Sequence, residues 1–111
     1  MESKSVEGAV ELLVAARGDH HRLEALPEDC RPTTMEASYQ IQDSLVKRLG
    51  LQVGGWKVGA TSAKAQEMLG TNEPFSGRMF KSGILGSKED LSMATLFTPG
   101  VEVEVAFLLA E

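Results

Sequence analysis

The sequence predicts an α+β protein in which helices pack on a small sheet. Apolar residues recur at three- and four-residue spacing in the first half of the chain, and two later stretches alternate with a period of two. A chain of 111 residues has room for one small domain with a single core. We expect helices near 5–16, 34–49 and 62–69, on an incomplete sheet that includes 53–59 and 101–110.

The first two helices are predicted by their apolar stripes and their ends. Thr33 or Thr34 can cap the second helix, and Gly50 follows Lys47 and Arg48, a basic pair that suits a helix C-terminus. Gly18 ends the first helix. The stripes consist of Val6, Val10, Leu13 and Ala16 in the first helix and Ser38, Ile41, Leu45 and Leu49 in the second.

A strand, a turn of small residues and a short helix follow. The stretch 53–59 has too many glycines for a helix and alternates well enough for a strand. Thr61 or Ser62 can then cap the third helix, which Gly70 ends. We also expect a strand at 77–80.

The last segment, 101–110, has the strongest strand pattern in the chain. It begins with strict alternation and continues as an apolar run of the kind found in buried strands with partners on both sides. Because the sequence stops directly after this run, we expect the 111 residues to be an N-terminal fragment of a longer protein.

Composition excludes several classes of function. Sixteen acidic residues against eleven basic ones give a net charge of −5, and the basic residues are scattered, which argues against nucleic acid as a partner. Cys30 is the only cysteine, so neither an intrachain disulfide nor a cysteine-based metal site can form. Apolar runs are too short for a signal peptide or a membrane span. We therefore expect a cytoplasmic protein.

Glu102 and Glu104 form the candidate metal site. The period of two places both carboxylates on one face of an extended chain, with Cα atoms about 6 to 7 Å apart. Mg²⁺ and Mn²⁺ prefer such oxygen ligands and accept water or substrate at their remaining positions. The alternative is a strand whose outer face is simply charged. Ala106 and Leu108 favour the metal site, because they continue the glutamate face as apolar residues.

Lys57 and the turn after it are candidates for anion binding. A lysine between Trp56 and Val58 in a glycine-flanked strand can hold an anion close to exposed backbone, although a lysine in such a place more commonly lies on the solvated face of an edge strand. Thr61 and Ser62 offer hydroxyl and N–H groups at a helix start, where a carboxylate is favoured and where plain capping is the alternative.

These residues resemble the fumarylacetoacetate hydrolase superfamily, in its branch of 2-keto-4-pentenoate hydratases and oxalocrotonate decarboxylases. The resemblance runs from about residue 35 to the end of the chain. Its most specific part is Gly-Trp-Lys-Val-Gly followed by Thr-Ser, with Glu-x-Glu roughly forty residues later. The matching segments are Ala37 to Gln42, Gly55 to Ser62, Leu69-Gly70, Glu73-Pro74, and Pro99 with Val101 to Phe107.

The resemblance implies a mixed β-roll and a site for a 2-oxo acid. Residues 1–90 would be an N-terminal region of helices and strand, and 91–111 the start of the β-roll catalytic domain. Glu102 and Glu104 match two ligands of a divalent metal, Mg²⁺ or Mn²⁺, whose third carboxylate would lie further downstream. Lys57 matches the active-site lysine. The substrate-binding positions, in a turn that lines the substrate carboxylate, are Gly59, Ala60, Thr61 and Ser62.

The implied activity is that of a metal-dependent lyase, a hydratase or a decarboxylase, acting on a short 2-hydroxydienoate or 2-oxo acid in aromatic-compound catabolism. Phe75 departs from the family pattern, since hydratases of the family often carry an aspartate there for proton transfer. Two alternatives remain open: an acylpyruvate-type C–C hydrolase and a non-catalytic assembly partner of such an enzyme. We expect the fragment to be inactive and the complete protein to be a homo-oligomer.

Overall fold

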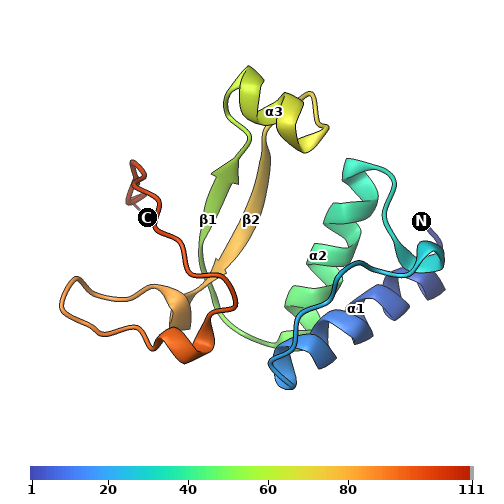
Figure 1. Ribbon diagram of the computed structural model, residues 1–111, viewed down its shortest axis with the longest axis horizontal. Coiled ribbons are helices and arrows are strands. Elements are labelled where there is room, and N and C mark those ends of the chain that lie inside the picture. The colour runs from blue at the N-terminus through green and yellow to red at the C-terminus, as the bar shows by residue number, and fades with distance from the viewer. Residues whose placement is uncertain (111) are drawn as a thin grey trace.

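The computed structural model describes residues 1–110 and confirms the α+β class. Within these residues, three α-helices accompany a two-stranded antiparallel sheet (Figure 1). The chain also forms single 3₁₀ turns at Glu28–Cys30, Lys81–Gly83 and Met93–Thr95. The helices and strands are α1 (Ser3–Gly18), α2 (Met35–Leu49), β1 (Val53–Gly59), α3 (Ala63–Leu69) and β2 (Phe75–Phe80).

The core lies between α1 and α2, which pack side by side (Figure 1). Its centre consists of Ala9, Val10, Ile41 and Cys30, and the Cys30 thiol is buried. Partly buried apolar side chains surround this centre: Val6, Leu12, Leu13, Val14, Leu26 and Leu45. Apolar residues of both predicted stripes therefore supply the contact between the two helices, whereas Ser38, which was predicted in the second stripe, is exposed.

Capping residues set the ends of α2 and α3. The side chains of Thr34 and Ser62 each accept a hydrogen bond from the backbone N–H three residues later, at 3.1 and 3.2 Å. Gly50 and Gly70 follow the helices at φ of 62° and 67°, in the left-handed region that glycine adopts without steric cost. Both predicted helices thus begin and end within one residue of the expected positions.

Side chains of α2 hold β2 in place. The Tyr39 hydroxyl accepts a hydrogen bond from the Ser76 N–H at 3.0 Å, and the Gln42 amide bonds both the Ser76 carbonyl and the Arg78 N–H. Asp43 adds an ion pair to Arg78 at 2.6 Å. These side chains satisfy the outer backbone groups of β2, as a neighbouring strand would. The helix pair and the sheet are therefore tied along this edge.

The register of the sheet decides which residues share a face. Gly59 lies opposite Phe75 and Lys57 opposite Gly77, and the side chains of directly opposed residues point to the same side. β2 begins at Phe75, two residues before the predicted start of this strand. One face therefore carries Lys57 together with Gly55, Gly59, Phe75, Gly77 and Met79.

The prediction of a strand at 101–110 is wrong. This segment has no regular secondary structure, and its alternate valines project into solvent, with Val101, Val103 and Val105 at 95%, 98% and 85% exposure. An alternating sequence orients side chains, but a strand forms only when a neighbour supplies backbone hydrogen bonds. Among residues 1–110, β1 and β2 pair only with each other.

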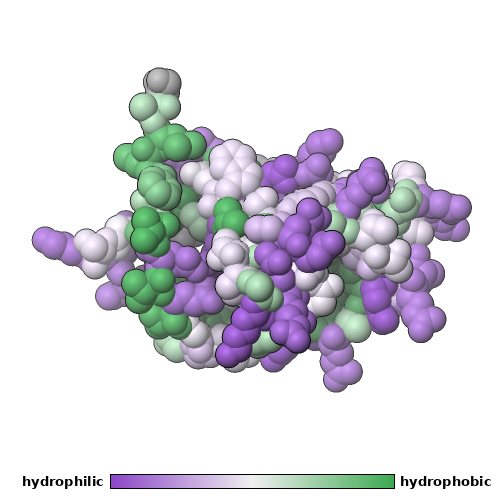
Figure 2. Space-filling model, turned by 90° about the horizontal axis from the view of Figure 1, so that it is seen from above, coloured by the Kyte–Doolittle hydropathy of each residue, from purple (hydrophilic) through white to green (hydrophobic). Residues whose placement is uncertain are grey.

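Hydrophobic side chains gather on the projecting C-terminal segment, as the space-filling view shows (Figure 2).

None of the helices within residues 1–110 combines the length and the apolar composition needed to cross a membrane.

Candidate functional site

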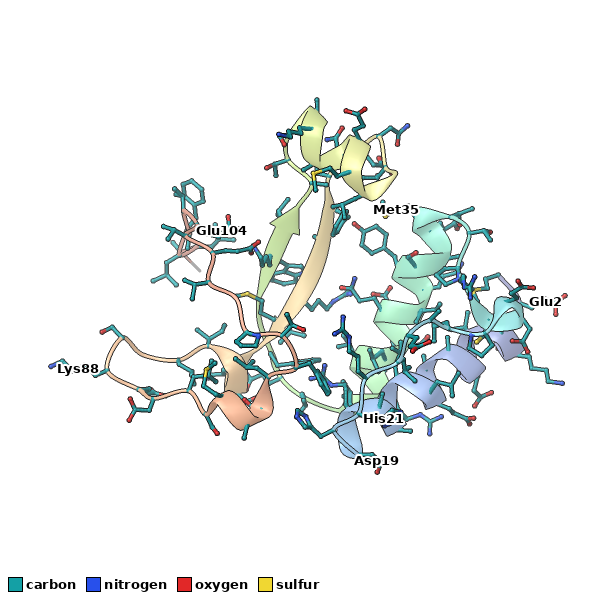
Figure 3. All side chains as sticks on the ribbon, in the orientation of Figure 1. Glu2, Asp19, His21, Met35, Lys88 and Glu104 are labelled. Carbon is teal, nitrogen blue, oxygen red and sulfur yellow. The ribbon has the colours of Figure 1, made fainter. Side chains whose placement is uncertain are left out.

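Lys57 meets both glutamates of the candidate metal site. Its Nζ donates a hydrogen bond to Oε1 of Glu104 at 2.5 Å and lies 3.2 Å from Oε2 of Glu102. Glu104 lies beside β1 in Figure 3. The sequence separates Lys57 from Glu104 by 47 positions, so the fold brings together three residues that were singled out independently.

The two carboxylates raise the pKa of Lys57. The hydrogen bond to Glu104 makes the largest contribution, and the bond to Glu102 comes next, because each favours the charged ammonium. The cluster is open to water, with 46% of the Lys57 side chain and 57% of the Glu104 side chain exposed. Solvent therefore screens the attraction, and the cluster contributes little to the stability of the fold.

The loop that follows α1 contacts the C-terminal segment. The ring of Phe97 stacks on His20, with centroids 4.4 Å apart, and Arg22 donates a hydrogen bond to the Thr98 hydroxyl at 3.3 Å. Both contacts lie just before the glutamates in the chain. The C-terminal segment is thus held at Phe97 and Thr98 by the loop after α1, and again at the glutamates by Lys57.

The donor atoms suit a hard divalent cation. Two carboxylate oxygens converge on one point, and these are the ligands that Mg²⁺ and Mn²⁺ prefer. The Lys57 ammonium now occupies that point, so a cation would have to displace it or bind beside it. Within residues 1–110, no group of three or more potential metal ligands comes together. The pair could therefore supply part of a coordination shell, with water or substrate supplying the rest.

The turn of the predicted substrate-binding residues follows Lys57 on the same strand. Ala60 is buried at φ 54°, a left-handed conformation, and its carbonyl accepts a hydrogen bond from the Gln66 side chain at 2.9 Å. Ser62 caps α3, and its side-chain oxygen accepts a hydrogen bond from the Ala65 N–H. Thr61 is exposed. The turn is thus fixed by its own hydrogen bonds. It begins directly after Gly59, the last residue of β1.

Phe75 and Gly77 border Lys57, and the sequence alone did not place them there. The ring of Phe75 packs on Gly59, so that a Cβ atom at Gly59 would come within 3.1 Å of it. The sequence did offer one signal for this pairing, because the glycine-rich strand is joined to the next apolar residues by a short connection. Strands that lie close together in the sequence often pair antiparallel. The register itself was not evident.

A cavity of about 770 Å³ lies elsewhere, between the start of α2 and the connection from α3 to β2. Its lining includes Tyr39, Glu73 and Phe75 but not Lys57 or the two glutamates. The lining of this cavity therefore does not include the charged cluster, which lies on an open surface.

Comparison with known proteins finds relatives of one kind. The chain is 39% identical over 77 residues to 2-keto-4-pentenoate hydratase of Burkholderia vietnamiensis, a match that covers 69% of the chain and 29% of that relative. It is 31% identical over 108 residues to 2-keto-4-pentenoate hydratase 1 of Dechloromonas aromatica, covering 95% and 41%. Identity to the TodF product hydratase of Pseudomonas putida is 32% over 80 residues, covering 69% and 30%.

The chain thus spans well under half the length of these relatives. No protein-family profile matches it, and no solved structure does.

Proposed function

The chain belongs to the family of the 2-keto-4-pentenoate hydratases, and from that membership we propose that the complete protein is a lyase of aromatic-compound catabolism. Its substrate would be a short 2-hydroxydienoate or the corresponding 2-oxo acid, and its reaction addition of water or loss of carbon dioxide. The observation that carries the proposal is the convergence of Lys57 with Glu102 and Glu104.

Each part of the cluster has a proposed role. Glu102 and Glu104 would hold Mg²⁺ or Mn²⁺, which as a Lewis acid would supply stabilisation of negative charge on a 2-oxo or enol oxygen. Lys57 would neutralise the carboxylate of the substrate, because its ammonium remains charged throughout the physiological range. Gly59, Ala60, Thr61 and Ser62 would border the substrate at the end of β1.

The remaining elements belong to the same proposal. The two-stranded sheet and the segment 101–110 would be parts of a mixed β-roll, with 1–90 as the N-terminal region and 91–111 as the start of the catalytic domain. Two carboxylates bind a divalent cation only weakly on their own. We therefore expect the 111 residues by themselves to bind Mg²⁺ weakly and to turn over no substrate.

Mutagenesis of the cluster tests this function. The protein encoded by the complete reading frame would be assayed with 2-hydroxypenta-2,4-dienoate for water addition and with 2-hydroxyhexa-2,4-dienedioate, which carries a second carboxylate on carbon 5, for loss of carbon dioxide, each with and without Mg²⁺. Glu102→Gln and Glu104→Gln should lower kcat/KM more than about a hundredfold. Lys57→Ala should lower it at least about tenfold and still leave Mg²⁺ bound.

Glu11→Gln, on the exposed side of α1, is the matched control and should behave as wild type. Wild-type Mg²⁺ dependence in both Glu102→Gln and Glu104→Gln would show that the carboxylates are only a charged surface. Activity without any Mg²⁺ requirement would contradict the proposed chemistry.

A further inference from the structure

Phe75 shares a face of the sheet with Lys57, and only glycines lie between them. Lys57 is opposite Gly77, and Phe75 is opposite Gly59, so Lys57 and Phe75 are diagonal neighbours across the two strands. Diagonal neighbours stand about 7 to 8 Å apart, within reach of long and aromatic side chains. The face therefore presents an ammonium group at one place and an aromatic ring close by.

The glycines leave the space between these two groups clear. Apart from Gly77 and its two chain neighbours, none of the described residues has an atom within 4 Å of the position that a Cβ of Gly77 would take. At Gly59 the nearest side chain is the Phe75 ring itself, at 3.1 Å from the corresponding position. The backbone thus forms a flat floor that runs from Lys57 to the ring.

The size of this floor matches a short acid. A five-carbon chain spans roughly 5 Å between its end carbons, which is less than the diagonal separation of Lys57 and Phe75. An acid whose carboxylate binds the Lys57 ammonium can therefore lie over the glycines with its other end against the ring.

Charge distinguishes the two ends of the floor. Of the six residues of β1 and β2 on this face, Lys57 alone is charged, and the carboxylates of Glu102 and Glu104 reach it from the C-terminal segment. Arg78 projects from the opposite face, where it pairs with Asp43. A second carboxylate at the Phe75 end would lose hydration against an aromatic ring without gaining a cation from the sheet. An apolar end would instead bury surface there.

We propose that Phe75 is a specificity-determining residue, which selects short 2-oxo acids with an apolar far end over those with a second carboxylate. This inference rests on the proposed function, since it takes the Lys57 cluster as the place where the 2-oxo acid carboxylate binds. It assigns to Phe75 a contact with the substrate and no part in proton transfer.

Binding of two matched acids tests the inference without need of turnover. The complete protein would be titrated calorimetrically, with Mg²⁺ present, against 2-oxopentanoate and against 2-oxoglutarate, which differ at the far carbon. Wild type should bind 2-oxopentanoate at least about tenfold more tightly. Phe75→Leu should keep that preference, and Phe75→Arg should reverse it. If Phe75→Arg does not fold, Phe75→Ser should reduce the preference to less than about threefold.

Met79 provides the control, because it lies on the same face on the other side of Lys57. Met79→Arg should leave 2-oxopentanoate the preferred ligand. Equal affinities in wild type, or a reversal by Met79→Arg and not by Phe75→Arg, would overturn the inference while leaving the proposed function intact. Failure of wild type to bind either acid would contradict the proposed function as well.

Discussion

The helix pair α1–α2 and the segment 101–110 begin from equally clear sequence patterns and reach opposite outcomes. Ile41 is 5% exposed, because the stripe of α2 meets a matching stripe on α1. Val103 is 98% exposed, because its apolar row meets nothing within residues 1–110. A helix makes its own backbone hydrogen bonds and needs a partner only for its side chains, whereas a strand needs one for both.

The largest effect should come from a change in the helix pair. Ile41→Ala should lower the free energy of unfolding by about 2 to 4 kcal/mol, since it removes buried methyl groups and leaves a cavity. Val103→Ala should change it by less than about 0.5 kcal/mol, because an exposed side chain loses no packing. Urea unfolding followed by circular dichroism of both variants measures the difference.

Similar losses for the two substitutions would mean that Val103 is buried in solution, and the contrast between the regions would fail. A small loss at Ile41 would show that the helix pair collapses around the vacated space.

Sequence reasoning succeeded where the determining interactions are local. Thr34, Ser62, Gly50 and Gly70 set helix ends through contacts within a few residues. The sequence identified both glycines, and it gave Thr34 and Ser62 each as one of two candidate caps. The failure at 101–110 has the opposite origin. Its strand pattern is clear, but no property of those ten residues states whether a partner is available.

A second contrast lies within the sheet, between Gly54 of β1, which residues 81 to 84 cover, and Gly77 of β2, which is open. Gly54→Ala should destabilise the protein by about 1 to 3 kcal/mol, because the new Cβ would lie 2.9 Å from the Cα of Lys81 and 2.8 Å from the Ile84 side chain. Gly77→Ala should have little effect, since its position opens onto clear space. Thermal unfolding of the two variants measures both.

The comparison shows where ordered packing of the C-terminal part ends. If Gly54→Ala destabilises the protein no more than Gly77→Ala does, residues 81 to 84 do not pack on β1 in solution. The part of the chain that lacks ordered packing would then begin before Ile84.

A smaller effect is expected at the start of α2. Thr34→Ala should lower the free energy of unfolding by about 1 kcal/mol, because the Ala37 N–H loses its hydrogen-bond acceptor. The neighbouring Thr33 is exposed, and Thr33→Ala should leave stability unchanged. Chemical denaturation curves of the two variants measure both effects. An equal loss of unfolding free energy at Thr33 and Thr34 would show that the two side chains share the cap.

The candidate site was predicted in its parts and not in its arrangement. Lys57, Glu102 and Glu104 were identified from residue type, spacing and resemblance, and the resemblance to 2-keto-4-pentenoate hydratases is confirmed by the relatives. Their direct contact depends on how the chain returns along α1 and β1, which no local pattern encodes. The position of Phe75 likewise depends on a strand register that the sequence left open.

The smallest effect concerns the tie between the two regions, the ion cluster of Lys57. In the metal-free chain, the pKa of Lys57 should lie above its ordinary value of 10.5, and a pH titration of its side-chain NMR signals measures it. Glu104→Gln should lower this pKa more than Glu102→Gln, because the bond to Glu104 contributes most. Glu67→Gln, on α3, is the control and should leave the pKa of Lys57 as in wild type.

The direction of this shift sets the pH range over which the tie acts. A pKa that is higher in the folded chain means that folding favours the ammonium, so its contribution is complete below about 10.5, the pKa of an unperturbed lysine, and is lost as pH rises through the raised pKa. As pH rises, segment 101–110 should therefore keep its tie to β1 until the ammonium loses its proton in strong alkali. A pKa that neither glutamine substitution alters would mean that the segment is already detached at neutral pH, and the two regions would then be independent.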